Sequence, residues 1–149
     1  PVLFDRAHDT HETIYRRSLS YYFWREWENG KHEFSPRLSE MIDGGTRISF
    51  NEYESALKNQ ATIAKKYDEI MRDFDVVLSP STADEAPVGL DTPDIPDHCL
   101  IFTMCYAPTI SVPILNGTSG LPVGIQVAAK RFNDYDLLDF AEFLCCATA

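Results

Sequence analysis

The chain has 149 residues, of which 44% are hydrophobic, which is enough apolar material to bury one core and form one domain. Its 13 basic and 23 acidic residues give a net charge of −10, which argues against nucleic acid or a membrane surface as a partner. No apolar run approaches the roughly 20 residues of a transmembrane helix, and no signal peptide is visible. The opening Pro1-Val2-Leu3-Phe4 is typical of the interior of a longer protein.

The four cysteines show no C-x-x-C spacing, and two of them are adjacent in the sequence. They are Cys99, Cys105, Cys145 and Cys146. Such a set is typical of thiols in a reducing compartment, which predicts a cytoplasmic location.

The first third of the chain predicts helices. Nothing interrupts a helix from 6 to 28, a segment rich in aromatic residues, and such a stripe usually belongs to a core or a subunit interface. Within it we expect Tyr22, Phe23 and Trp27 to contribute to self-association or to contacts with a missing part of the protein. Ser35 is expected to cap a short helix, with the Gly44-Gly45 pair beyond its end.

The middle of the chain predicts a long helix followed by a buried strand. Ser49-Phe50-Asn51-Glu52 forms a capping box, and the helix that it opens is expected to run to about Phe74. The apolar run 75–79 then suits a buried strand. Residues 80–98 carry four prolines and five acidic residues without periodicity, which fits either a linker or a loop that crosses a site.

The last third predicts a pair of antiparallel strands and a helix. The runs 109–115 and 123–129 are apolar, and Asn-Gly and Ser-Gly lie in the turn between them. Asp134 is in position to cap the helix that follows. These elements predict an α/β fold with helices packed on part of a mixed β-sheet. Three strands are few for this much helix, so we expect the sheet to be incomplete without further strands.

Candidate catalytic groups are sparse. Ser79 and Ser81 follow a strand end, where a catalytic serine can lie, but neither has the G-x-S-x-G setting or an evident base nearby. His8 and His11 are spaced to bind a metal, yet no third ligand accompanies them, so a solvated helix start is the favoured interpretation. We therefore predict no catalytic residue, no metal site and no cofactor within this chain.

Three segments carry a family resemblance. GLPVGIQV, which comes after ISVP, closely resembles the C-terminal segment of the amidase signature family. YDEIMRDFDVVLSPSTADEAP resembles that family's long helix, the next strand and its Pro-rich exit loop, and SPRLSEMIDGG resembles the element before the helix. The resemblance covers 35–147 and is most specific at 75–87 and 109–132. It implies a large mixed central sheet covered by helices, of which this chain, 1–149, is a single C-terminal unit.

The resemblance also implies a chemistry that this chain does not itself contain. Amidase signature enzymes form an acyl-enzyme with a lysine, a serine on a cis peptide and a nucleophilic serine in a Gly- and Ser-rich segment, all of which precede the matched region. What carries over is a role in completing the sheet and the acyl pocket. The positions that match pocket-lining residues of the family are Cys99, Leu100, Ile101, Thr103 and Met104.

The sequence departs from the family beside these pocket positions. The common Asn-Leu-x-Gly-Leu-Pro becomes Thr103-Met104-Cys105-Tyr106-Ala107-Pro108, so that Asn and Gly are replaced by Thr103 and Tyr106. Asp97 is a candidate for recognising an amine-bearing substrate, or a solvated loop acid.

Three hypotheses follow. The first is an amidohydrolase that acts on a small-molecule amide, with the N-terminal half of the same enzyme as its partner and a homo-oligomer as a further possibility. The second is a stand-alone acidic scaffold or binding module without chemistry. The third is a transamidase (amidotransferase) subunit that works on glutaminyl or asparaginyl substrates with partner proteins. A Gly/Ser-rich segment encoded upstream, with a lysine before it, favours the first or third hypothesis.

Overall fold

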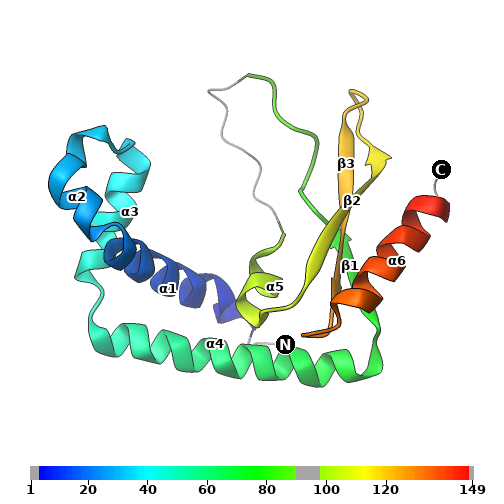
Figure 1. The fold of residues 1–149 in the computed structure, drawn as a ribbon, viewed down its shortest axis with the longest axis horizontal. Coiled ribbons are helices and arrows are strands. Elements are labelled where there is room, and N and C mark those ends of the chain that lie inside the picture. Colours follow the sequence, from blue (N-terminus) through cyan, green and yellow to red (C-terminus); the bar gives the residue numbers. More distant parts are fainter. Residues whose placement is uncertain (1–3, 90–97, 148–149) are drawn as a thin grey trace. The chain divides into compact units, whose positions relative to one another are not determined.

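The computed structural model describes residues 4–89 and 98–147, and the chain divides into two compact units, Pro1–Ile63 and Ala64–Ala149. The first unit is helical, and the second contains a three-stranded sheet with helices (Figure 1). The α/β fold class is therefore confirmed. The expectation that 1–149 acts as a single C-terminal unit stays a prediction.

The helices of the first unit follow one another closely along the chain. They are η1 (Phe4–Arg6), α1 (Ala7–Tyr22), α2 (Trp24–Gly30), η2 (Lys31–Glu33), α3 (Pro36–Arg47) and the first part of α4 (Phe50–Ile70). The single helix expected over 6–28 was wrong, because the chain breaks at Phe23 (φ −98°, ψ 9°). There the Phe23 ring packs edge-on against Phe34, with ring centroids 6.2 Å apart. The break thus gives the Phe23 ring a packing partner beyond α2.

Helix α3 begins as the sequence predicts but ends later. The Ser35 hydroxyl accepts a hydrogen bond from the Leu38 amide at 3.3 Å, and Pro36 occupies the first helical position. The Gly44-Gly45 pair does not lie beyond the helix end but inside the helix, which was a wrong expectation. A Cβ on Gly45 would overlap the Arg16 carbonyl group of α1. The glycines therefore serve the close approach of α3 to α1 and not the termination of α3.

Arg16 reinforces the contact between these two helices. Its Nε donates to Glu12 at 2.8 Å and its Nη1 donates to Glu40 of α3 at 2.6 Å. The Arg16 side chain is 23% exposed. The shared guanidinium holds the pKa of the Glu40 carboxyl below its usual value. Because Glu40 is exposed to solvent, this pair contributes mainly to alignment of the helices.

The capping box at the start of α4 is confirmed. The Glu52 carboxylate accepts from the Ser49 amide at 2.8 Å, and the Ser49 hydroxyl accepts from the Glu52 amide at 3.3 Å. Hydrogen bonds to Ser49 lower the pKa of Glu52. The α-helix ends at Ile70, and a 3-10 turn, η3 (Met71–Asp73), leads to Phe74.

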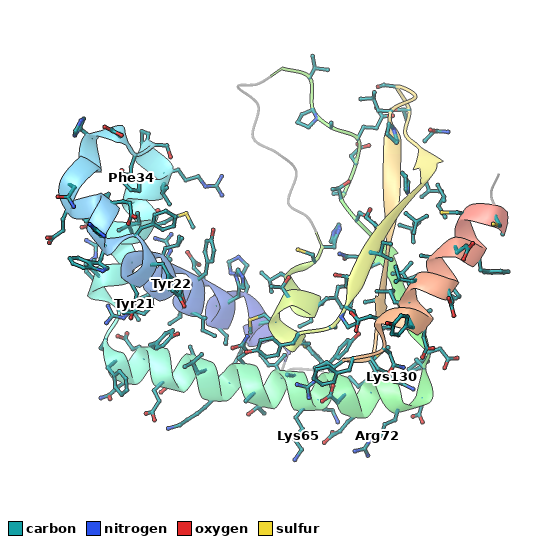
Figure 2. The ribbon with its side chains drawn as sticks, in the orientation of Figure 1. Tyr21, Tyr22, Phe34, Lys65, Arg72 and Lys130 are labelled. Carbon is teal, nitrogen blue, oxygen red and sulfur yellow. The ribbon has the colours of Figure 1, made fainter. Side chains whose placement is uncertain are left out.

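Several aromatic side chains of the first unit are exposed. Tyr21 and Tyr22 are 70% and 75% exposed (Figure 2), while Trp27 is half-buried and packs against Phe34 at 5.7 Å. Burying such rings against a partner releases free energy in proportion to the area removed from water. Tyr22 is therefore well placed for the association expected from the sequence, whereas Trp27 already has a packing partner.

The second unit contains the three strands that the sequence predicts. They are β1 (Val76–Pro80), β2 (Thr109–Asn116) and β3 (Pro122–Ala129), in the spatial order β1-β3-β2. Both pairings are antiparallel, and β2 and β3 are joined by the turn that the Asn-Gly and Ser-Gly dipeptides indicate. Gly120 adopts a positive φ of 84° in this turn, a backbone conformation that glycine reaches without strain.

Strand β2 carries a proline in its interior. The register between β2 and β3 shifts between Val112 and Leu115, where Pro113 lies. Proline has no amide hydrogen to donate, so it is tolerated where a strand borders a sheet or bulges. Among the described residues β2 pairs with β3 alone, which leaves its other edge available.

The hydrophobic core of the second unit lies between one sheet face and α6 (Asp134–Ala147). Val112, Val127 and Ala129 point toward this helix and pack with Leu137 and Ala141. Asp134 was expected as a cap, but it is the first helical residue. Because side chains alternate along a strand, this core also determines which residues lie on the sheet face opposite α6.

We expect Gly45→Ala to destabilise the first unit. The new methyl group would overlap backbone atoms of Arg16, which cannot rotate away, and such overpacking typically lowers the free energy of unfolding by ~1–3 kcal/mol. Gly30→Ala is the matched control, since its nearest neighbour would be 3.9 Å away. Urea unfolding measures both variants. Equal stability of Gly45→Ala and the parent chain would contradict this packing.

Candidate functional site: a polar row on the sheet

A row of polar side chains crosses the sheet on the face opposite α6. Ser79 of β1, Gln126 of β3 and Ser111 of β2 are paired in register across the three strands. Gln126 is only 7% exposed, and its Oε1 accepts from the Ser79 hydroxyl at 3.5 Å. The Ser79 hydroxyl therefore helps to orient this buried amide.

The row continues at the end of β1. The Ser81 and Ser111 hydroxyls are 2.6 Å apart, and the Ser81 amide donates to the Gly124 carbonyl at 2.9 Å. A Cβ on Gly124 would overlap both hydroxyl groups, so glycine is required for the two serines to meet here. Beside them lies a concavity of about 500 Å³, and its remaining lining residues are Thr82, Asp84, Glu85, Ala86, Pro87, Pro113 and Pro122.

Glu85 fixes one wall of this concavity. Its carboxylate accepts from the Ser119 amide at 2.7 Å, in the turn between β2 and β3, and the residue is 9% exposed. A Cβ on Gly117 would overlap the carboxylate, so the turn leaves room for it. The loop after β1 is thereby attached to the β2–β3 turn.

The pocket segment expected from the sequence folds as a short helix. This helix is α5 (Leu100–Cys105), and Cys99 immediately precedes it. The His98 amide donates to the Ser81 carbonyl at 3.1 Å, which connects the start of α5 to the polar row. No local pattern in the sequence indicates this connection, because it joins residues on either side of the loop.

The five pocket candidates occupy different environments. Cys99, Leu100 and Ile101 are half-buried, and Thr103 is exposed and donates to the Cys99 sulfur at 3.8 Å. Met104 is 1% exposed and belongs to the interior of the second unit. The remaining candidate, Asp97, lies outside the described residues.

Tyr106 ends α5 in a left-handed conformation. Its φ is 56° and its ψ is 31°, and the side chain is 62% exposed. Its amide donates to Thr103, and the Ala107 amide donates to Phe102. Glycine is the residue that most often ends a helix in this way.

Two buried groups lie at α5, namely Cys105, its last residue, and Tyr67, which packs against Phe102 of the same helix. Tyr67 donates its hydroxyl to the Ala129 carbonyl at 3.0 Å, and burial raises its pKa to about 12. Burial, with a contribution from Asp68, raises the pKa of the Cys105 thiol to about 11. A thiol with so high a pKa stays protonated at neutral pH, which makes Cys105 a poor nucleophile.

The concavity offers hydrogen bonds, but among the described residues the partner of the Ser81 hydroxyl is Ser111 and not a carboxylate. Its lining residues supply hydroxyls and carboxylates, with neither a histidine nor a lysine to activate Ser81. Within 4–89 and 98–147, no group of three or more His, Cys, Asp or Glu side chains is arranged to bind a metal. The same ranges contain no helix long and apolar enough to cross a membrane. The geometry supports binding and orientation of a polar ligand.

Comparison with known sequences identifies one family. The family model described as Amidase matches residues 6–138. One subunit of the glutamyl-tRNA(Gln) amidotransferase of Wolinella succinogenes is 35% identical over 97 residues, which cover 60% of this chain and 21% of that protein. The protein of the same description from Treponema denticola is 26% identical over 123 residues, 73% of this chain and 25% of its own length. The chain thus spans about a quarter or less of these relatives.

Solved structures show the same fold. A crystal structure of an amidase aligns with a TM-score of 0.85 at 19% identity, covering 96% of this chain and 36% of that one. A bacterial aryl acylamidase of the amidase signature family aligns with a TM-score of 0.70 at 17% identity, covering 90% and 32%. At these identities the likeness concerns the fold alone.

We expect Glu85→Ala to lower the free energy of unfolding by about 1–3 kcal/mol, because it removes the charged acceptor for the Ser119 amide. Glu85→Gln keeps an oxygen acceptor at that position, so we expect a smaller loss. Glu142→Ala, which removes an exposed carboxylate of α6, controls for the change in charge. Chemical denaturation compares the three variants. Equal losses for the Ala and Gln variants of Glu85 would contradict the role of the hydrogen bond.

We also expect the chain to lose stability in alkali. The folded pKa of Cys105, about 11, lies above its ordinary value of 9.0, so the stabilisation is complete below pH 9 and is lost as the pH rises toward 11. One such group changes the free energy of unfolding by up to about 1.4 kcal/mol per pH unit. Thermal melts between pH 8 and about pH 11 measure this slope. Cys105→Ala should flatten it, and an unchanged slope in that variant would contradict the assignment.

Proposed function

Because this chain belongs to the amidase signature family, we propose that it forms the C-terminal portion of an enzyme that hydrolyses a carboxylic amide. In the proposed reaction a serine attacks the amide carbon, the amine leaves, and water then hydrolyses the acyl-enzyme. The serines and the lysine of this mechanism lie outside the chain. The observation that supports this division of roles is the family match across 6–138, together with a concavity that no histidine or lysine lines.

The portion seen here completes the sheet and one wall of the substrate pocket in this proposal. Ser81 and Ser111 would present hydroxyls to the polar part of an amide substrate. Leu100 and Ile101 are half-buried and Thr103 is exposed, so these three side chains have surface to offer to an acyl group. Cys99 would shape the same wall from the start of α5, and Met104 would support it from the interior.

Two further proposals concern partners and location. The proposed partners are a small-molecule amide and the N-terminal half of the same enzyme, and the exposed Tyr22 is available for a homo-oligomer contact. The proposed location is the cytoplasm, on the strength of the cysteine pattern in the sequence.

A transamidase subunit is the second candidate function. The observation that favours it is the description of the relatives from Wolinella succinogenes and Treponema denticola as glutamyl-tRNA(Gln) amidotransferase subunits. In that case the amide substrate would be glutamine, and the released ammonia would pass to a second acceptor. A non-catalytic binding module is the remaining alternative.

We expect the 149-residue chain by itself to hydrolyse no amide. Neither a histidine nor a lysine lines the described concavity to activate Ser81, so we expect its substrate contacts alone to form no acyl-enzyme. The measurement is turnover of a panel of small amides, anilides and glutamine by the purified chain. Activity that disappears in Ser81→Ala but persists in Thr118→Ala would show that the chemistry resides here and would contradict the proposal.

A second experiment repeats the turnover assay with the chain joined to the segment encoded upstream of Pro1. If that segment contains the Gly/Ser-rich region and a preceding lysine, we expect the joined protein to hydrolyse amides. Preference for glutamine would favour the transamidase, and preference for anilides or aliphatic amides would favour the hydrolase. Inactivity of the joined protein on every amide would favour the binding module.

A further inference from the structure

Phe132 holds a strained position in the turn after β3. The Asn133 amide donates to the Lys130 carbonyl at 3.1 Å and closes this turn, and Phe132 adopts a φ of 68° within it. Left-handed backbone favours glycine or asparagine and is unusual for a bulky residue. The Phe132 side chain is 90% exposed, so the fold gains almost no burial from the ring. A strained residue that does not stabilise the fold points to a function.

Cations surround this ring. A concavity of about 330 Å³ is lined by Phe132 together with Asp68, Arg72, Lys130 and Arg131. The Arg131 guanidinium donates from Nε and Nη2 to the two oxygens of the Asp68 carboxylate. Asp68 is therefore already neutralised, and Arg131 is held in place as part of the wall.

Arg72 and Lys130 have no such ion pair, although Arg72 lies close enough to the Glu69 carboxyl to help lower its pKa. Across 4–89 and 98–147, neither side chain has a carboxylate within 4.0 Å. Figure 2 shows Lys65 projecting from the same side of α4 as Arg72, which lies just beyond the end of that helix. Arg72 and Lys130 therefore place positive charge in the same concavity as the Phe132 ring, in a chain whose net charge is −10.

We propose that this concavity binds an aromatic phosphate of the nucleoside monophosphate class. The base would stack on the exposed Phe132 ring, and the phosphate would accept hydrogen bonds from the Arg72 guanidinium and the Lys130 ammonium. Arginine matches phosphate oxygens in a bidentate manner, and stacking on an aromatic side chain is tolerant of the kind of base. Arg131 is a positioning residue, since its Nε and Nη2 already donate to Asp68.

A small ligand fits this surface better than a long polyanion. The cations of the site are few, while the chain as a whole is strongly acidic and would repel a nucleic acid along its length. The site is also distinct from the polar row, because Lys130 follows the end of β3 whereas Gly124 lies near its beginning. The proposal therefore does not depend on amide hydrolysis.

Calorimetric titration of the chain with AMP tests the proposal at low salt. We expect saturable binding of AMP that weakens about tenfold in Phe132→Gly. This variant should melt at the same or a higher temperature than the parent chain, because glycine relieves the left-handed strain. Phe132→Asn, which also tolerates this backbone, should behave alike. Arg72→Gln and Lys130→Gln should each weaken AMP binding and reduce its salt dependence. Tyr135→Ala and Arg37→Gln, which remove exposed groups outside the concavity, should bind AMP as the parent chain does.

Two partial probes separate the contributions of ring and phosphate. Adenosine alone and inorganic phosphate alone should each bind more weakly than AMP. Phosphate that binds as tightly as AMP, with no dependence on Phe132, would overturn the proposal and indicate an adventitious ion only. AMP that shows no saturation at millimolar concentration, or that binds equally well to Phe132→Gly and the parent chain, would overturn it as well.

Discussion

The hydrogen-bond ladders on the two edges of β3 are the constraint on which the second unit depends. The last four residues of this strand are buried, and a buried strand must have partners for its amides and carbonyls. Strands β1 and β2 supply them on either side. The end of β3 is then attached to α4 by the Tyr67 hydroxyl at Ala129 and by the ion pair of Asp68 with Arg131. Loss of either ladder would expose the backbone on which the core and the polar row are built.

The alternation of side chains along β3 couples the core to the candidate site. Val127 and Ala129 point into the core with α6. Because successive side chains of a strand point to opposite faces, Gln126, the neighbour of Val127, must point to the other face. A shift of one residue in register would exchange the two sets and bury the wrong groups. Packing on the α6 face therefore determines that Ser79 and Ser111 meet Gln126, although neither serine contributes to that core.

Local signals in the sequence predicted the helices and strands of this fold better than the contacts between them. The capping box at Ser49 and the turn before β3 depend on neighbouring residues, and both predictions were confirmed. The Gly44-Gly45 pair was misread as a helix stop because its cause, the backbone of α1, lies far away in the sequence. The polar row was not predicted for the same reason, since its register and the bond from His98 to Ser81 are long-range contacts.

Left-handed residues show how a fold can impose a conformation that its sequence does not favour. Tyr106 and Phe132 are the non-glycine residues with positive φ in the described ranges, and both rings are exposed. Hydrogen bonds to Thr103 and Phe102 hold the first conformation, and the bond from Asn133 to Lys130 holds the second. Because both rings are exposed, their burial does not offset the cost of these conformations. The hydrogen-bonded backbone around each residue must therefore impose the conformation, at Tyr106 from the end of α5 and at Phe132 from the turn after β3.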